Sequence, residues 1–271
     1  MERWFTVWAT CWAFRKPWLD GIVRPPGKGV PHVAAGARCR PALRFLANPA
    51  HCCFGGSMTP RHNPEVWPVV HDERLALLRD LENLSAKQWE TQSLCPGWDV
   101  HDVLAHLTDS AKTTRWGFIR RMVLAGFDFD KDNAVGIATQ RCVDPAQTLA
   151  GFRDVLGRTS TPPAAPATRL VEAFVHGEDI RRPLGMRGDY PASPVAKALA
   201  YQLRTSVKMG GGKERAAGYT LVATDTTFGH GAGQEVHGKA IALLLAVSGR
   251  PVAPDELTGP GAEAFVERTR G

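Results

Sequence analysis

The stretch that decides the fold is Leu170-Val-Glu-Ala-Phe-Val-His-Gly-Glu-Asp-Ile-Arg-Arg182, which Pro183 follows. Proline removes a backbone donor and clashes with the preceding helical turn, so the spacing predicts a helix that ends before Pro183. Glu172 and His176 are four residues apart and therefore share one helical face. Apolar residues lie beside this face: Leu170, Val171, Phe174 and Val175. The pattern predicts a core helix that carries a carboxylate and an imidazole.

A second histidine occurs in an apolar helical pattern upstream. The segment Cys95-Pro-Gly-Trp-Asp-Val-His-Asp-Val-Leu-Ala-His-Leu107 places His106 between Leu104 and Leu107. Taken singly, each motif is typical of a solvated polar face or of a hydrogen-bonded core histidine. Taken together, two facing helices would bring His106, Glu172 and His176 into one bundle core. Two imidazoles and a carboxylate form a three-ligand site with an open position, which suits catalytic zinc or another divalent ion.

The periodicity along the chain predicts an α+β protein with two domains. Helices are expected over about 68–84 and 99–125, from the Asp144-Pro145 start onward, and over 170–182. Four helices with short connections predict an antiparallel bundle, and we place this domain at 64–185. A small α+β domain is expected at 190–271. It should hold helices over 193–209, 240–247 and 261–269, strands at 219–224 and 234–236, and a glycine-rich turn at 228–233.

Composition narrows the functional classes. The formal charge is +6, but residues 1–57 hold eight Lys and Arg against two acids, so the remainder is balanced. This balance argues against a nucleic-acid partner for the main body, and no apolar run is long enough to span a membrane. No C-x-x-C pair suggests a disulfide framework or a cysteine-rich zinc site, so a cytoplasmic location is expected. We expect 1–57 to be a disordered leader or a misassigned start, with the true start near Met58.

The two helical motifs, with Pro-Gly-Trp ahead of the first, resemble the mycothiol-dependent maleylpyruvate isomerase family within the DinB-like bundle superfamily. The resemblance covers about 64–270 and includes Ala223-Thr-Asp225 and Ser248-Gly-Arg250. It implies that His106, Glu172 and His176 bind zinc, and that Arg250 is a catalytic residue that holds the substrate. It also implies mycothiol as the thiol cofactor or cosubstrate, and a small electrophile as the substrate of an isomerase or S-transferase. For Arg250, the alternative is a solvated arginine after a helix.

Two other functions fit the same ligand set. A metal-dependent hydrolase would use the open position for activated water. A non-enzymatic bundle would bind metal or a small ligand for structure or sensing. We expect a monomer or homodimer that binds neither nucleic acid nor a membrane.

The remaining polar residues are assigned as follows. Asp179 is the best candidate to orient His176, while Asp102 and Asp109 are more typical of surface carboxylates. His101 is not expected to be a ligand, and His230 and His237 are expected to face solvent.

Overall fold

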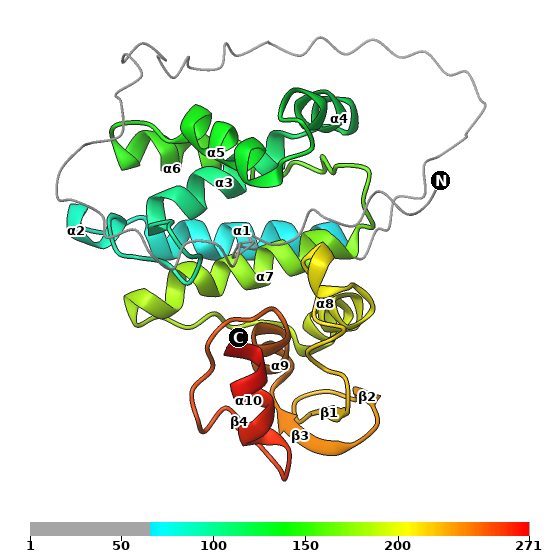
Figure 1. Ribbon diagram of the computed structural model, residues 1–271. Coiled ribbons are helices and arrows are strands. Elements are labelled where there is room, and N and C mark those ends of the chain that lie inside the picture. Colours follow the sequence, from blue (N-terminus) through cyan, green and yellow to red (C-terminus); the bar gives the residue numbers. More distant parts are fainter. Residues whose placement is uncertain (1–65, 271) are drawn as a thin grey trace, which may run out of the picture.

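Residues 66–270 are described by the computed structural model (Figure 1). They form a helix-rich α+β structure with a four-stranded sheet. The predictions for 1–57 and for a start near Met58 lie outside these residues. No helix within 66–270 has the length and apolarity needed to cross a bilayer.

Four helices of the N-terminal part pack around one core. They are α1 (Val66–Leu81), α3 (Val100–Lys112), α6 (Pro145–Arg153) and α7 (Ala167–Arg181). Helices α1 and α3 each contact both α6 and α7. Their core holds Leu78, Leu104, Phe152 and Ile180, each at most 3% exposed. The one-turn helix α2 (Ala86–Trp89) lies between α1 and α3.

Local capping sets where α3 and α6 start. Asp99 caps α3, and its carboxylate accepts a hydrogen bond from the backbone N–H of Asp102 at 2.7 Å. The Asp102 side chain accepts in return from the Asp99 N–H, completing a capping box. Asp144 caps α6, with Pro145 in its first turn, so both predicted starts are confirmed.

The single helix predicted over 99–125 is wrong, because the chain breaks after Lys112. Thr113 has an extended backbone, and the Thr114 hydroxyl accepts a hydrogen bond from the N–H of Gly117 at 3.1 Å. Threonine is a good N-cap, so a second helix, α4 (Arg115–Leu124), starts there. Helix α5 (Phe129–Gln140) follows and packs against α3.

The C-terminal part combines three helices with a mixed sheet. The helices are α8 (Ala192–Arg204), α9 (Ala240–Val247) and α10 (Ala262–Arg270). The strands are β1 (Tyr219–Ala223), β2 (Gly229–Gly231), β3 (Gln234–Gly238) and β4 (Leu257–Thr258), in the order β2-β1-β3-β4. Strands β1 and β3 are parallel, while β2 and β4 pair antiparallel at the edges. The segment predicted as a glycine-rich turn therefore contains β2, and β3 extends two residues beyond the predicted strand.

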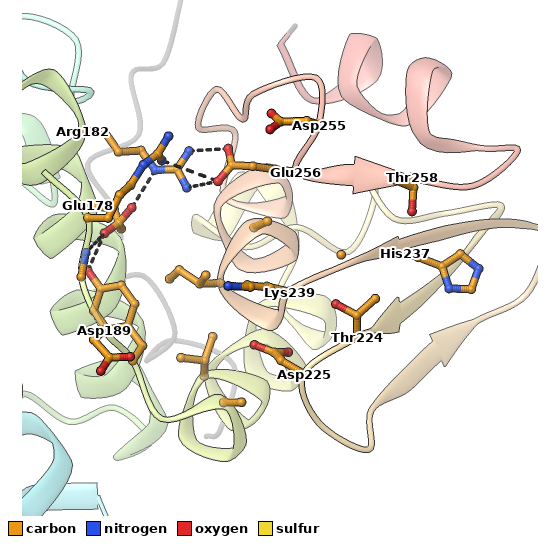
Figure 2. A pocket seen from close by; sticks show the side chains of 18 residues that line it. Glu178, Arg182, Asp189, Thr224, Asp225, His237, Lys239, Asp255, Glu256 and Thr258 are labelled. Carbon is orange, nitrogen blue, oxygen red and sulfur yellow. Dashed lines mark hydrogen bonds and ion pairs between the residues drawn. The ribbon is translucent and has the colours of Figure 1, made fainter. Parts of the chain in front are cut away.

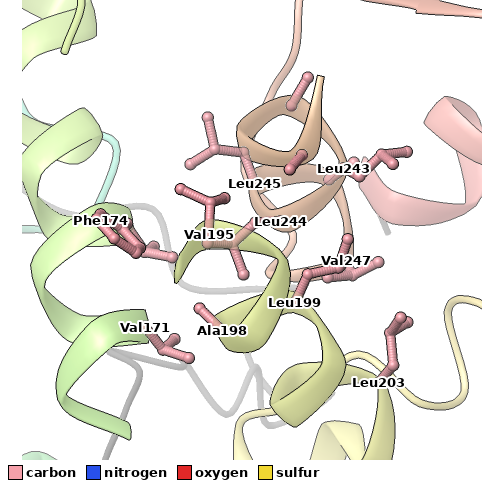
Figure 3. Packing of buried hydrophobic residues seen from close by; sticks show 14 of the residues in the cluster. Val171, Phe174, Val195, Ala198, Leu199, Leu203, Leu243, Leu244, Leu245 and Val247 are labelled. Atoms are coloured by element: carbon pink, nitrogen blue, oxygen red, sulfur yellow. The ribbon is translucent and has the colours of Figure 1, made fainter. Parts of the chain in front are cut away.

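Helix α7 is shared between the two parts of the molecule. Its Val171 and Phe174 pack toward Val195 of α8 and Leu245 of α9 (Figure 3). All its residues from Thr168 to Arg181 are buried. Full burial of each large apolar side chain stabilises the fold by about 1.5–3 kcal/mol. The helix that carries Glu172 and His176 is thus held on both sides.

Candidate functional site

The polar stripe of α7 faces α3 in the protein interior. Glu172, His176 and Asp179 lie along α7 at helical spacing and are each at most 3% exposed. Buried ionisable side chains need specific partners, because an unpaired charge is costly away from water. The partners of this stripe come from α3, from the loop before α3 and from the C-terminal part.

His106 and His176 meet across the α3–α7 contact. Their ring centroids are 5.1 Å apart with an interplanar angle of 75°. Trp98 lies on His106, with centroids 5.1 Å apart. Burial, and then the nearby charges of His176 and Arg169, hold the pKa of His106 well below its usual value. His106 is therefore neutral, which is the form of imidazole that binds metals.

Glu172 lies one turn from His176 and is held by two groups. The Ser110 hydroxyl donates a hydrogen bond to its Oε2 at 2.7 Å, and Arg169 Nη1 lies 2.9 Å from the same oxygen. Arg169 Nη1 also donates to Ser110 Oγ at 2.8 Å. These contacts fix the carboxylate in place. The structure brings Glu172 onto the same buried face as His176, with His106 beside the His176 ring.

Asp179 orients His176. Its Oδ2 lies 2.9 Å from His176 Nδ1, so Nδ1 carries a proton and donates it to the carboxylate. The other ring nitrogen, Nε2, is buried and has no hydrogen-bond partner among the described residues. Although burial opposes it, the hydrogen bond with Asp179 and the neighbouring Cys95 raise the pKa of His176 to about 10. The structure thus points a nitrogen without a partner into the interior.

Arg250 and Cys95 complete the surroundings of Asp179. Arg250 donates from Nε to Oδ1 at 2.7 Å and from Nη2 to Oδ2 at 2.9 Å. The Cys95 thiol donates to Oδ2 at 3.0 Å, and its sulfur lies 3.4 Å from Arg250 Nη2. Despite burial, the Arg250 charge holds the pKa of Asp179 below its ordinary value. Arg250 is only 5% exposed, so the alternative of a solvated arginine is wrong.

Cys95 was not selected as a site residue from the sequence. Its Sγ, His176 Nδ1 and Asp179 Oδ2 lie within 4.8 Å of one another, as the atoms of a metal site do. The sequence signal was its place directly before the Pro-Gly turn that leads into α3. That signal is weak, because the partners of Cys95 are more than 80 residues away.

The other polar residues considered above have different partners. Asp102 pairs with Arg141 at 2.7 Å and Asp109 pairs with Arg121 at 2.6 Å. Asp109 is buried rather than on the surface. His101 Nε2 lies 2.7 Å from Thr148 Oγ1, away from the stripe. In the C-terminal part, His230 is exposed, whereas His237 is half-buried beside Glu235, at 2.9 Å.

A groove of about 750 Å³ lies between the end of α7 and the C-terminal sheet (Figure 2). Arg182 crosses it to Glu256 at 2.7 Å and also bonds Glu178 at 2.7 Å. Neither His176 nor Asp179 lines this groove. Glu178 projects from another side of α7, and Arg182 follows the end of that helix, so the groove is separate from the buried stripe.

Comparisons with known proteins place these residues in context. Residues 70–121 match the family model of the mycothiol maleylpyruvate isomerase N-terminal domain. The match runs from α1 into α4 and includes His106. Comparison with curated proteins gave no match.

Two solved structures match the chain at low sequence identity. A crystal structure of the mycothiol-dependent maleylpyruvate isomerase is 17% identical, with a TM-score of 0.46, over 76% of this chain and 97% of that chain. A crystal structure of a histidine-to-alanine mutant of that enzyme is 16% identical, with a TM-score of 0.47 and the same coverage. Over residues 70–121, the chain is therefore similar to the mycothiol maleylpyruvate isomerase N-terminal domain family.

Proposed function

We propose that this protein is a metal-dependent enzyme whose divalent ion, zinc, is held by His106, Glu172 and His176. The observation that carries the proposal is His176 Nε2, which is buried without a hydrogen-bond partner among the described residues. A buried polar nitrogen without a partner is destabilising, and a metal ion would satisfy it.

The spacing of the two histidines supports such an ion, whereas the three mutually close ligand atoms found among the described residues belong to Cys95, His176 and Asp179. Zinc binds imidazole nitrogen at about 2.0–2.1 Å, so two imidazoles on a tetrahedral ion have ring centres about 5 Å apart. The observed separation of His106 and His176 is 5.1 Å. Asp179 supports the arrangement, because a metal-bound histidine commonly donates its other N–H to a carboxylate. Binding at Nε2 would replace a proton on His176, so metal uptake would release protons.

The proposed cofactor is mycothiol, and the proposed substrate is a small electrophile. When bound, the metal would favour the thiolate form of the thiol, which is the nucleophile. The match of residues 70–121 to the mycothiol maleylpyruvate isomerase family supports this thiol. Isomerisation and S-transfer share these site residues, and we propose the two together as the reaction class.

The protein's own residues would hold the site in shape. Ser110 and Arg169 fix the Glu172 carboxylate. Asp179 fixes the His176 ring, and Arg250 fixes Asp179. We propose Arg250 as the residue through which the C-terminal part contributes to catalysis.

A second ligand set, Cys95, His176 and Asp179, competes with this proposal. In the structure, Asp179 is already neutralised by the two hydrogen bonds from Arg250. A cation at Asp179 would lie beside the guanidinium of Arg250, and a cation at Glu172 would lie beside that of Arg169, so these contacts do not rank the two sets. Cobalt-substituted protein separates the two: a thiolate-to-cobalt absorption band that disappears in Cys95→Ser would indicate the second set.

The finer description of fold and setting is also proposed. Helices α1, α3, α6 and α7 would form the antiparallel, DinB-like bundle of a domain at 64–185, and 190–271 would form the second domain. The contacts of α1 and α3 with both α6 and α7 support the bundle. We further propose a cytoplasmic location.

Metal analysis tests the proposal directly. Elemental analysis of the purified full chain should find one divalent ion, strongly reduced in His106→Ala and in His176→Ala. His101→Ala is the matched control, because His101 lies on the same helix but bonds Thr148. Undiminished metal in either site variant would remove that histidine from the site. Electrophiles are then screened with mycothiol, with and without chelator; turnover without any thiol would contradict the proposed cofactor.

A further inference from the structure

Helix α4 presents an apolar surface to solvent. Its inner side holds Phe118 and Met122, which are buried. Its outer side carries large apolar residues in one stretch, and we call Trp116, Val123, Leu124 and the following Phe127 the α4 face. Their exposed fractions are 81%, 58%, 69% and 69%. Single exposed apolar residues are ordinary, but four on one ten-residue helix and its end suggest an interaction surface.

Phe127 adds a second, independent observation. Its φ is 62°, and it is the one non-glycine residue with positive φ in the described part of the chain. This left-handed conformation is unfavourable for a side chain with a Cβ, and glycine would adopt it freely. Strained residues cluster at functional and ligand-binding positions. The residue in this conformation carries an exposed aromatic ring at the end of α4.

Exposed charges of both signs flank the α4 face. Arg115 and Arg120 lie on α4, and Asp128 and Asp130 lie just beyond its C-terminal end. None of these four side chains has an ion-pair partner among residues 66–270. Burial raises the pKa of Asp130, and the charge of Asp128 raises it further, so the two acids lie near each other. Within this part of the chain, α4 thus carries two arginines without an ion-pair partner. Asp130 also lacks one after the end of α4, while Asp128 caps α5 by accepting a hydrogen bond from the N–H of Lys131 at 3.1 Å.

We propose that the α4 face pairs with the α4 face of a second copy of this chain. In an interface with two-fold symmetry each patch must complement itself. Antiparallel pairing of two α4 helices brings the Arg115 end of each copy to the Asp130 end of the other. The apolar side chains then form the dry centre and the charges form the polar rim, as in protein interfaces generally. Tryptophan at such a centre is typical of interface hot spots.

The same charges disfavour the main alternative partner. A lipid surface would be recognised by exposed aromatic residues together with basic ones. Cytoplasmic leaflets are anionic, so Asp128 and Asp130 beside the face would oppose binding to them. A second copy of the chain offers an opposite charge both to the arginines of α4 and to the aspartates that follow it.

Sedimentation equilibrium of the purified full chain, from micromolar to hundreds of micromolar, tests the proposal. The expected result is a reversible dimer whose dissociation constant rises at least about tenfold in Val123→Asp. Val143→Asp is the matched control, because Val143 is 102% exposed on the connection between α5 and α6. Circular dichroism should show unchanged helix content in both variants. A wild-type chain that stays monomeric, or a dimer that Val123→Asp leaves intact, would overturn the proposal.

Charge reversal tests the antiparallel arrangement itself. Arg115→Glu and Asp130→Arg should each weaken the dimer by about 2–5-fold, as exposed ion pairs do. The double variant should recover wild-type affinity, because the reversed charges pair again across the interface. Failure of the double variant to recover would exclude this pairing. Sedimentation of monomeric chain with anionic vesicles would assign the face to a membrane instead.

Discussion

Replacement of Asp179 by asparagine separates the orienting role of this residue from its role in stability. The change keeps the shape of the side chain but removes its charge. Arg250, only 5% exposed, would then lie beside a neutral amide. Breaking a buried ion pair from one side costs about 3–5 kcal/mol. At about 2–4 °C per kcal/mol for a protein of this size, the midpoint of thermal unfolding should fall by about 6–20 °C.

The same variant should bind metal more weakly. Loss of a carboxylate that orients a metal-bound histidine typically costs about 10- to 100-fold in affinity, so a drop of about that size is expected. The assay is competition with a chelating indicator at a temperature where circular dichroism shows the variant folded. Asp109→Asn is the matched control: it breaks the pair with Arg121 at 2.6 Å without touching His176. Equal metal affinity in Asp179→Asn and wild type, despite the lower melting point, would refute an orienting role.

Three further predictions concern stability. Burial raises the pKa of Glu73 from 4.5 to about 7, although Arg181 opposes this shift. The protonated carboxyl therefore makes its full contribution to folding stability below pH 4.5, and this contribution is lost as pH rises through 7. Glu73→Gln cannot ionise, so its free energy of unfolding in urea should rise by about 3 kcal/mol relative to that of wild type between pH 4.5 and 7. Parallel pH profiles of the two unfolding free energies would contradict this. Phe174→Ala, at the contact of α7 with the C-terminal part, should cost about 3–5 kcal/mol, whereas the exposed Phe127→Ala should cost far less. Gly231→Ala should cost roughly 2 kcal/mol or more, because φ is 90° and the new Cβ would lie 2.2 Å from a backbone oxygen of Tyr219; wild-type stability would show that β2 shifts freely.

The helices could be predicted because their signals are local. Asp99 with Asp102, and Asp144 with Pro145, are caps that the sequence alone reveals, and the structure contains both. The break at Thr113 was missed for a physical reason. The apolar pattern continues across it, and the Thr114 cap stabilises a new start only weakly compared with tertiary packing.

The surroundings of the site could be predicted only in part. Asp179 was expected beside His176, because the two are three residues apart on one helix, and they are 2.9 Å apart in the structure. Cys95 and Arg250 lie 155 residues apart, yet their side chains meet at 3.4 Å. Contacts at that sequence separation depend on how the C-terminal part packs on α7. No periodicity or capping rule reports such packing.

That packing also explains why α7 is the place for the site. One side of the helix is covered by α1 and α3, and the other by α8 and α9. A carboxylate or imidazole between two cores loses its water and must find protein partners or a ligand. Glu172 finds Ser110 and Arg169, and Asp179 finds Arg250. His176 finds a partner among the described residues for one nitrogen only, so the remaining nitrogen is the group left to bind a ligand. If unfolding measurements showed His176→Phe, which keeps a ring but has no nitrogen, to be as stable as wild type with and without metal, that nitrogen would have no role in binding.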